Sequence, residues 1–258
     1  MSRVIVYVAS RMGSTLGAER LTRTEARQHR TRIRLRKVAY ELMSTAGVDA
    51  TTIQQITDAA DIGFGTFYNY FDTKEALARD VLDCMIHNLG VKNDLITQEL
   101  GETDPVRIVA NSVRFVIREM IEDPVFQWWV DQFDLLVDRM RIGFGPFGLR
   151  DIDRAVAAGQ YALVGGDREL AWSQLVWVMA AGGRDILYGA QRSEDERAIV
   201  EGILRIMGVD HAEAHEATSA VLPPTPELPI DFTIETRDAA ASPSGTAHPA
   251  AAPNRSHQ

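Results

Sequence analysis

The sequence predicts an all-α protein of 258 residues, in which a small N-terminal three-helix unit is followed by a larger helical body. Three observations support this prediction. Apolar residues recur at helical spacing over most of the chain, and strand-like alternation is almost absent. Pro105 and Pro124 stand where amphipathic stretches begin, a position that proline favours at the start of a helix. With 45% hydrophobic residues, the chain can bury a substantial core.

The first helix is expected from about Arg27 to Ala46, with Gly47 as its C-cap. Its inner face is a stripe at spacings of three and four residues, formed by Leu35, Val38, Ala39, Leu42 and Ala46. The segment "VDATTIQQITDAADI" then predicts a short second helix. Thr51 or Thr52 can cap it, with Gln54 or Gln55 placed for a capping box. Its inner face would hold Ile53, Ile56, Thr57 and Ala60.

The third helix is expected over residues 64–71, within the aromatic-rich stretch "IGFGTFYNYF". At 100° per residue, Phe67 and Phe71 share one face and would anchor the helix in the core. Asn69 points to the opposite side, and Tyr68 and Tyr70 flank it. The rings therefore have two roles, because two of them anchor the helix and two border an outward edge.

Further helices are expected over 74–99, 105–121, 125–140, 149–164, 167–190 and 194–207, with "IGFGPFG" (142–148) as a loop. Residues 1–20 are interpreted as a disordered leader, and residues 221–258, rich in Pro, Ala, Ser and Thr, as a disordered tail. A single cysteine, Cys84, excludes a disulfide framework and suggests a reducing cytoplasm. No apolar run is long enough to span a membrane.

The net charge of −9 is unevenly distributed. Between Arg20 and Tyr40 the chain carries eight basic residues and one acid, a net +7, which leaves −16 for the rest. A basic arm on an acidic body suggests that one end meets a polyanion. The alternative interpretation is a solvated helix face.

The outward edge of the third helix has the chemistry of a DNA-reading surface. An Asn side chain can pair with the N6 and N7 atoms of adenine in the major groove. Tyr hydroxyls suit phosphate oxygens, which position a protein on DNA without specifying sequence. Gly65 allows the backbone to approach closely. Two short helices joined by a tight turn are the helix-turn-helix arrangement.

The segment "TTIQQITDAADIGFGTFYNYFDTKEAL" (51–77) resembles the DNA-binding segment of TetR-type transcriptional regulators, and the resemblance extends over about residues 27–80. It implies a helix-turn-helix domain over 21–75 and a ligand-binding and dimerisation domain over 76–220. Carried over by position, it implies recognition-helix contacts to DNA from Phe64, Gly65, Thr66, Tyr68, Asn69 and Tyr70, and phosphate contacts from Thr52 and Lys74. Phe64 is as well placed for burial as for base contact.

The second domain contains an aromatic cluster, which is either ordinary core or an apolar pocket for a hydrophobic effector such as a lipid, steroid or aromatic metabolite. The residues proposed to line such a pocket are Asn111, Phe115, Trp128, Trp129, Gln132, Phe133, Trp172 and Trp177. By family position, residues 167–207 would form a homodimer interface, with Val176, Met179, Ala180, Gly183 and Leu187 on one stripe. The alternative for this stripe is packing within the chain.

Enzymatic function is not expected. "IGFG" occurs twice without the GK[ST] that a phosphate loop needs, and no nucleophile motif surrounds a serine. His211 and His215 stand four residues apart without a recognisable partner acid, so neither a metal nor a cofactor is predicted. The expected function is a cytoplasmic, ligand-released repressor that binds a near-palindromic operator on double-stranded DNA as a homodimer. The alternative is a ligand-binding or protein-interaction module without specific DNA recognition.

Overall fold

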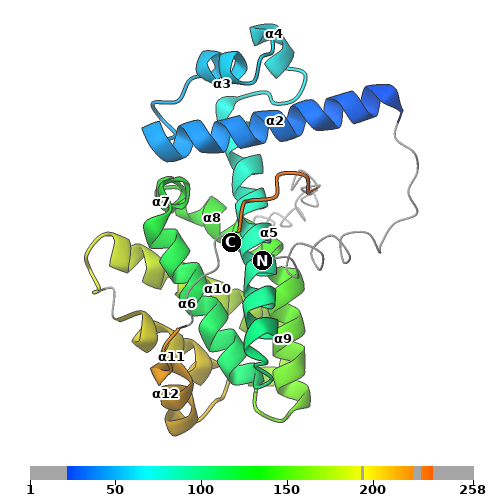
Figure 1. Cartoon of the computed structure of the whole chain (residues 1–258). Coiled ribbons are helices and arrows are strands. Elements are labelled where there is room, and N and C mark those ends of the chain that lie inside the picture. The colour runs from blue at the N-terminus through cyan, green and yellow to red at the C-terminus, as the bar shows by residue number, and fades with distance from the viewer. Residues whose placement is uncertain (1–21, 193–194, 223–227, 235–258) are drawn as a thin grey trace, which may run out of the picture.

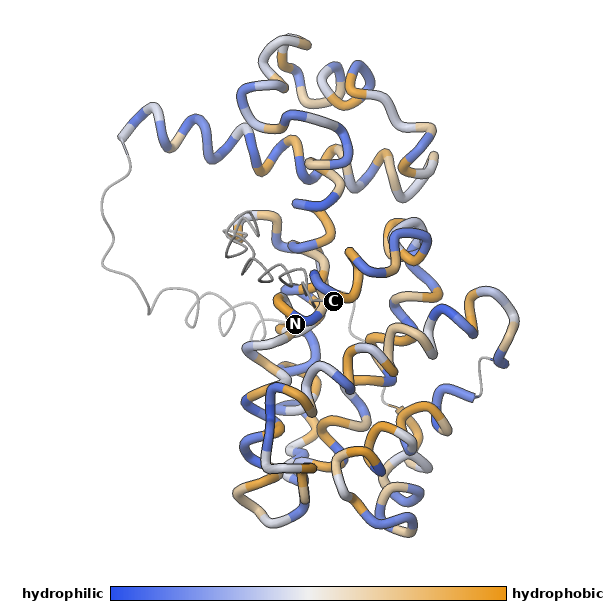
Figure 2. The backbone as a smooth tube through the Cα atoms, turned by 180° about the vertical axis from the view of Figure 1, so that it is seen from behind, coloured by the Kyte–Doolittle hydropathy of each residue, from blue (hydrophilic) through white to orange (hydrophobic). Residues whose placement is uncertain are grey.

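The computed structural model describes residues 22–192, 195–222 and 228–234. Within these residues the chain forms eleven α-helices and one 3-10 helix, with no strand, which confirms the all-α fold class. A small head of three helices lies at one end, and a single long helix connects it to a larger helical body (Figure 1). Figure 2 shows the apolar stripes of the body helices alternating with polar faces.

The head begins with α2 (Arg23–Ala46), which starts four residues before the expected position. Thr22 explains the earlier start, because its hydroxyl accepts a hydrogen bond from the Glu25 amide while the Glu25 carboxylate accepts one from the Thr22 amide. Gly47 ends the helix at a φ of 88°, as expected of a glycine C-cap.

The next two head helices are α3 (Ile53–Ala59) and α4 (Phe64–Phe67). Thr52 caps α3 in a capping box with Gln55, which decides between the two candidate caps. Asp61 turns the chain toward α4 at a φ of 51°, a left-handed conformation that Asp tolerates better than most residues. The third helix is shorter than predicted, because a turn replaces the helix after Phe67.

Helix α5 (Lys74–Leu100) starts under the head and runs through the body. Thr73 caps its first turn, and Gly101 ends it in a left-handed conformation. Near its head end, the Asp80 carboxylate accepts hydrogen bonds from Nε and Nη2 of the buried Arg36 of α2, at 2.8 and 3.0 Å. This buried pair fixes α2 against α5.

The body also contains α6 (Pro105–Glu122), α7 (Pro124–Val130), α8 (Phe133–Gly143), α9 (Gly145–Ala157), η1 (Val164–Gly166), α10 (Arg168–Leu187), α11 (Glu196–Ile206) and α12 (His211–Ser219). Pro105 and Pro124 do begin helices. The expected helix 125–140 is divided into α7 and α8, and the expected loop 142–148 lies within the ends of α8 and α9. Helix α12 was not predicted.

A buried ion pair connects α6 to α11. The Glu196 carboxylate accepts hydrogen bonds from Arg114, at 3.1 and 3.2 Å, and from Arg118, at 2.7 and 2.9 Å. Burial alone would raise the pKa of Glu196, but the hydrogen bonds and charges of the two arginines outweigh it and lower the pKa. Arg114 is therefore part of the framework of the body.

Residues 228–234 differ from the expected disordered tail. Phe232 is buried, and Ile230 and Ile234 pack against the core. This segment, the orange trace between α2 and α5 in Figure 1, lies across the junction of head and body. The expected leader (1–20) and, within the expected tail (221–258), residues 223–227 and 235–258 lie outside the described residues. No described helix is long and apolar enough to cross a membrane.

Candidate functional site

The α4 turn presents an exposed edge on the head. Phe67 and Phe71 are buried, as predicted, and hold the turn against α2 and α3. Phe64 and Tyr68 are each 48% exposed, and their rings meet edge to face at 5.7 Å between centroids. Asn69 is also exposed. Phe64 is therefore not buried in the core, and its contact with a base stays a prediction.

The other predicted contact residues of the turn differ in their solvent exposure. Gly65 is exposed, and a Cβ there would meet nothing within 4 Å. Thr66 and Tyr70 are half-buried, and Tyr70 packs against the core. Gly63 precedes α4 without a side-chain cap. The exposed part of the turn is therefore an edge of Phe64, Gly65, Tyr68 and Asn69, which we call the reading edge.

The two predicted phosphate contacts stand at helix starts. Thr52 is exposed, but its hydroxyl is already engaged with the Gln55 amide and side chain. Lys74 is half-buried, and its Nζ donates to the carbonyls of Val48 and Asp49 at 2.8 and 3.1 Å. Both residues therefore have a structural role in the head, whether or not they also reach DNA.

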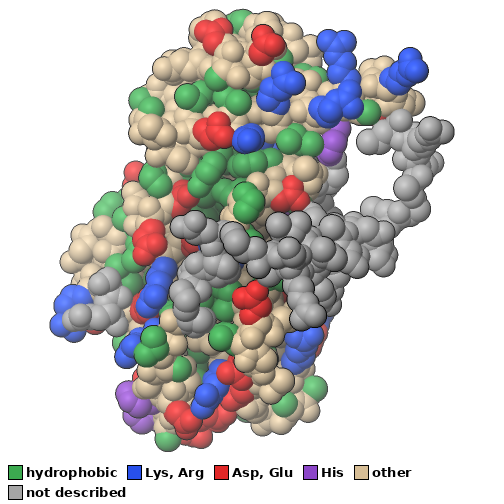
Figure 3. Space-filling model, viewed as in Figure 1, with side chains coloured by type: hydrophobic (Ala, Val, Ile, Leu, Met, Phe, Trp, Pro, Cys, Tyr) green, Lys and Arg blue, Asp and Glu red, His purple; other side chains and the backbone are tan. Residues whose placement is uncertain are grey.

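The basic run in α2 divides into two groups. Arg32 and Arg36 point to α5 and bond Asp80, and Arg32 also lies over the Phe71 ring, 5.0 Å from its centroid. The exposed arginines recur every three or four residues along one face and form a basic stripe of Arg23, Arg27, Arg30 and Arg34. Figure 3 shows Lys and Arg side chains gathered over the free end of the head.

The basic stripe leads to the helix-turn-helix. Arg34 Nη1 donates to the carbonyl of Ala60, the residue that ends α3, at 3.1 Å. The last arginine of the stripe therefore contacts the end of α3, the helix that precedes the α4 turn. The charge at this end of the chain and the candidate base-reading groups lie on the same part of the molecule.

The body contains a small inner pocket of about 60 Å³ between α5, α6, α9 and α10. Its walls are mostly apolar, with three aromatic side chains, Phe144, Phe147 and Trp172. Two glycines, Gly90 and Gly148, bring the helix backbones close to these rings. A Cβ at Gly90 would lie 2.4 Å from Phe147 Cε2, and one at Gly148 would lie 2.1 Å from Trp172 Cζ3.

The polar side of the inner pocket consists mainly of acceptors: Asn93, Asp94 and Asp151, with Ser112. The Arg150 guanidinium closes this side, donating to both oxygens of Asp94 at 2.6 and 2.8 Å and to those of Asp151 at 2.9 and 3.1 Å. The Asn93 side chain is buried, and its Oδ1 has no hydrogen-bond partner among the described residues. A buried acceptor without a donor is costly, so this oxygen marks a place for a ligand donor.

The eight residues predicted for a ligand pocket are dispersed, and of these only Trp172 lines the inner pocket. Trp128 donates from Nε1 to Asp49 Oδ1 at 3.0 Å, connecting α7 to the head, and Trp129 is buried beside it. Phe133 and the exposed Trp177 meet edge to face at 5.7 Å. The remaining three lie elsewhere. Phe115 is buried against Ile96 and Leu222, whereas Gln132, which precedes α8, and Asn111, on α6, are half-buried.

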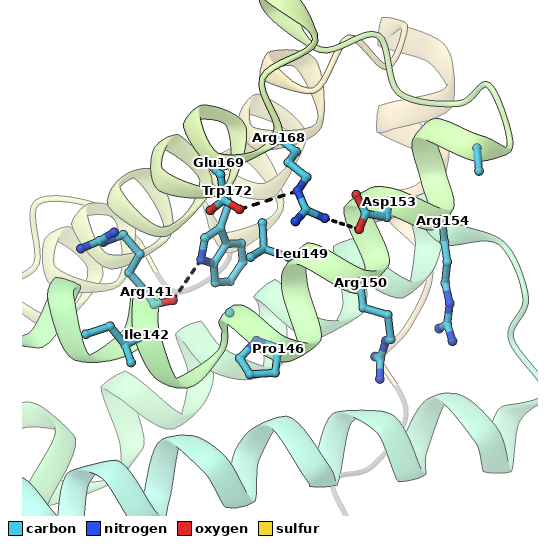
Figure 4. A pocket seen from close by; sticks show the side chains of 12 residues that line it. Arg141, Ile142, Pro146, Leu149, Arg150, Asp153, Arg154, Arg168, Glu169 and Trp172 are labelled. Atoms are coloured by element: carbon cyan, nitrogen blue, oxygen red, sulfur yellow. Dashed lines mark hydrogen bonds and ion pairs between the residues drawn. The ribbon is translucent and has the colours of Figure 1, made fainter. Parts of the chain in front are cut away.

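Sequence reasoning missed Asn93 and Asp94 as candidate site residues. The available signal was a pair of polar residues in the C-terminal part of α5, one turn after Leu89 and Gly90. Trp172 lines both the inner pocket and an open outer groove of about 800 Å³, whose other walls include Arg141, Arg150, Arg154 and Arg168 (Figure 4). Acids pair these arginines, as Asp153 pairs Arg168.

The stripe expected at a dimer interface is mostly internal. Val176, Met179, Ala180 and Gly183 are buried within the chain. The outer face of α10 instead exposes large apolar side chains at Leu170, Trp177 and Tyr188. Packing within the chain therefore explains the predicted stripe, and the apolar side chains that remain exposed on α10 lie on its outer face.

His211 and His215 do have a partner acid, since their Nδ1 atoms lie 2.8 and 3.3 Å from the two carboxylate oxygens of Glu201. Glu201 belongs to α11, so the contact depends on how α11 and α12 pack. Within the described residues, no group of three or more His, Cys, Asp or Glu side chains has an arrangement that could hold a metal ion.

A helix-turn-helix head joined by one long helix to a helical body defines a DNA-binding transcriptional regulator. The family "Bacterial regulatory proteins, tetR family" matches residues 35–81, and "Tetracyclin repressor-like, C-terminal domain" matches residues 104–220. The chain belongs to the TetR family of regulators.

Relatives support a ligand-responsive regulator. The HTH-type transcriptional repressor DhaR of Mycobacterium sp. (strain GP1) is 30% identical over 100 residues, covering 39% of this chain and about half (48%) of that protein. The solved structure of RolR with resorcinol has a TM-score of 0.70 and 29% identity, covering 78% of this chain and 100% of that chain. RolR without ligand has a TM-score of 0.66 and 29% identity, covering 75% and 99%.

Proposed function

We propose that this protein is a cytoplasmic repressor that binds a near-palindromic DNA operator as a homodimer and is released by a small hydroxylated aromatic compound. The observation that carries the DNA-binding part is the exposure of the reading edge on the same head as the basic stripe of α2, whose Arg34 bonds the carbonyl at the end of α3. Repression is supported by the similarity to DhaR, which is described as a repressor.

On DNA, Asn69 would read a base edge, and Tyr68 would contact a phosphate or base through its hydroxyl. The exposed ring of Phe64 would touch a thymine methyl group. Thr52 and Lys74 would approach phosphates at the starts of α3 and α5, and Gly65, Thr66 and Tyr70 would let the turn fit the groove. The basic stripe would add phosphate contacts that depend strongly on salt.

The test of DNA recognition is sequencing of genomic fragments bound by the purified protein at two salt concentrations. We expect one enriched near-palindrome that persists at the higher salt concentration. Asn69→Ala should abolish its enrichment, and Tyr68→Phe should weaken binding by removing only a hydroxyl, while both variants keep the melting temperature of the wild type. Broad enrichment that disappears with added salt would instead favour the alternative, a protein without specific recognition.

The effector is proposed to bind in the inner pocket. The aromatic walls suit a planar ring, and Asn93 Oδ1 can accept a hydrogen bond from a ring hydroxyl. The similarity to RolR, whose structure contains resorcinol, an aromatic diol, supports this ligand class over a lipid or steroid. The volume of about 60 Å³ is below the ~150 Å³ of a cavity known to take up benzene, so binding requires the half-buried Phe147 to move.

Resorcinol is the probe that tests this site. We expect it to raise the melting temperature of the wild type, and Asn93→Ala to reduce this shift. Asn111→Ala is the matched control, because Asn111 Oδ1 is also buried without a partner but Asn111 does not line the pocket. An equal loss of the shift in both variants would place the ligand elsewhere.

The homodimer is proposed to form through the outer face of α10, where Trp177 and Leu170 are exposed. Two heads in such a dimer would face half-sites about one helical turn of DNA apart. Trp177→Glu should produce a monomer in sedimentation velocity at micromolar concentration. A wild-type protein that is already monomeric there would contradict the dimer.

A further inference from the structure

Residues 228–234 cross the junction between the head and the body. On the head side, the Phe232 ring lies 5.8 Å from the Tyr40 ring of α2, measured between centroids. On the body side, the Asp231 backbone and the Asn88 side chain of α5 exchange two hydrogen bonds, at 2.8 and 2.9 Å. A segment of seven residues therefore contacts both α2 and α5, and Figure 1 shows it lying below α2 and beside α5.

The same segment supplies hydrogen-bond partners to a buried charge, the guanidinium of Arg36. The Arg36 guanidinium is almost inaccessible, and Asp80 satisfies its Nε and Nη2 atoms. Its Nη1 donates to the carbonyls of Phe232 and Ile234, at 2.9 and 2.7 Å. Hydrogen bonds to buried charged groups are among the stronger ones, and a donor left without them carries a large desolvation cost. The Arg36–Asp80 pair at the junction thus depends on the segment.

The segment also lies one turn of α5 away from the inner pocket. Asn88 holds it, and Gly90 and Asn93 of the same helix line the pocket. Between the two, the His87 ring meets the ring of Phe147, a wall of the pocket, edge to face at 5.9 Å. His87 is followed directly by Asn88, which bonds the Asp231 backbone, so the contact with Phe147 and the contact with the segment come from neighbouring positions of α5.

We propose that residues 228–234 form a strap that holds the head in one orientation relative to the body, and that displacement of Phe147 by an effector loosens the strap through His87. The first part is independent of DNA and ligand; the second rests on the proposed function. The strap biases the protein toward one of two head orientations, and an effector acts by its different affinity for the two.

The first experiment measures head orientation without DNA or effector. Spin labels at Ala59→Cys on α3 and Asp138→Cys on α8 report the head-to-body distance by pulsed electron resonance, since the only native cysteine, Cys84, is buried. Labelled chains are mixed with an excess of unlabelled chains, so that only distances within one chain contribute. The wild type should give one narrow distance distribution.

Phe232→Ala and Asn88→Ala should each broaden or shift this distribution. Thr233→Ala is the matched control, because its exposed side chain lies in the strap and only its backbone amide bonds Asp231. Asn88→Ala provides a second, independent test in case the Phe232→Ala variant does not fold. Circular dichroism checks that both variants remain helical. A distribution unchanged in both folded variants, or changed equally by Thr233→Ala, overturns the strap.

The second experiment measures affinity for the DNA fragment recovered from the genomic selection, with and without resorcinol. The strap variants should bind this fragment at least about fivefold more weakly without resorcinol, the lower end of typical coupling between sites, and should respond less to its addition. Unchanged affinity and response, together with a broadened distance distribution, would overturn the coupling and leave the orientation role. If the wild type binds no specific fragment, the proposed function fails, and the distance measurement still decides the strap.

Discussion

Gly90→Ala tests whether the inner pocket is as tightly bounded as the structure describes. Gly90 is buried in the middle of α5, where the added methyl carbon would lie 2.4 to 2.9 Å from three atoms of the Phe147 ring. Side chains do not tolerate such approaches, so the ring must turn into the pocket or away from α5. Either movement changes the space that a ligand would occupy.

The change in the free energy of unfolding caused by Gly90→Ala follows from two opposing contributions. Replacing Gly by Ala inside a helix stabilises it by about 1 kcal/mol. Overpacking a filled core costs about 1–3 kcal/mol. Gly202→Ala in α11 provides a matched control, because a Cβ there meets nothing within 4 Å and only the helix contribution applies. We therefore expect Gly90→Ala to be about 1–3 kcal/mol less stable than Gly202→Ala.

Urea unfolding at one fixed protein concentration measures both variants, since a dimer's stability depends on concentration. The resorcinol-induced melting shift should also be smaller in Gly90→Ala than in Gly202→Ala. If Gly90→Ala is as stable as Gly202→Ala and keeps the full shift, Phe147 does not pack against α5 as described, and the reasoning about the pocket is wrong.

Three further predictions concern the head and the titration of the body. Phe67→Ala should destabilise the head by about 3–5 kcal/mol and abolish DNA binding while the dimer persists in sedimentation; retained DNA binding would contradict its anchoring role. Thr52→Ala should cost about 1 kcal/mol through loss of the α3 cap, whereas Thr45→Ala, exposed on α2, should cost less in the same urea assay. Burial raises the pKa of Asp83 to about 6, against the opposing charge of Arg139, so the folded protein binds this proton more tightly than the unfolded chain. The resulting stability, about 2–3 kcal/mol, is complete below pH ~4 and lost as the pH rises through 6. Asp83→Asn should remove this part of the pH dependence of urea unfolding, and an unchanged slope would exclude Asp83 as its source.

The head could be predicted from sequence because its determinants are local. Thr52 and Gln55 form their capping box within four residues, and the spacing of Phe67 and Phe71 alone places both rings on one face. The length of α4 was overestimated because helix periodicity cannot show where a turn replaces the last hydrogen bonds. The capping box at Thr22 was visible in the sequence but lay before the first apolar residue of the stripe.

The body was less predictable because its site depends on tertiary packing. The density of aromatic residues predicts a pocket around Trp128 and Trp129. In the structure, Trp128 contacts the head and Trp129 is buried in the core. The glycines of "IGFGPFG" suggested a loop, whereas Pro146 occupies the first turn of α9 and Gly148 makes room for Trp172. Nothing in a single sequence distinguishes a glycine that ends a helix from one that admits a ring from a neighbouring helix.

Because α5 is long, a small tilt of this helix at the inner pocket produces a larger displacement of the head. The 27 residues of α5 extend about 40 Å at 1.5 Å per residue, with the inner pocket along the shaft and the reading head at one end. From Gly90 at the inner pocket to Lys74 at the head, α5 extends about 24 Å, so a tilt of about 5° at the pocket moves the head end by about 2 Å, enough to break a hydrogen bond. In the proposed dimer, a ligand no larger than a single ring that displaces Phe147 against α5 would therefore misplace both heads on the two half-sites.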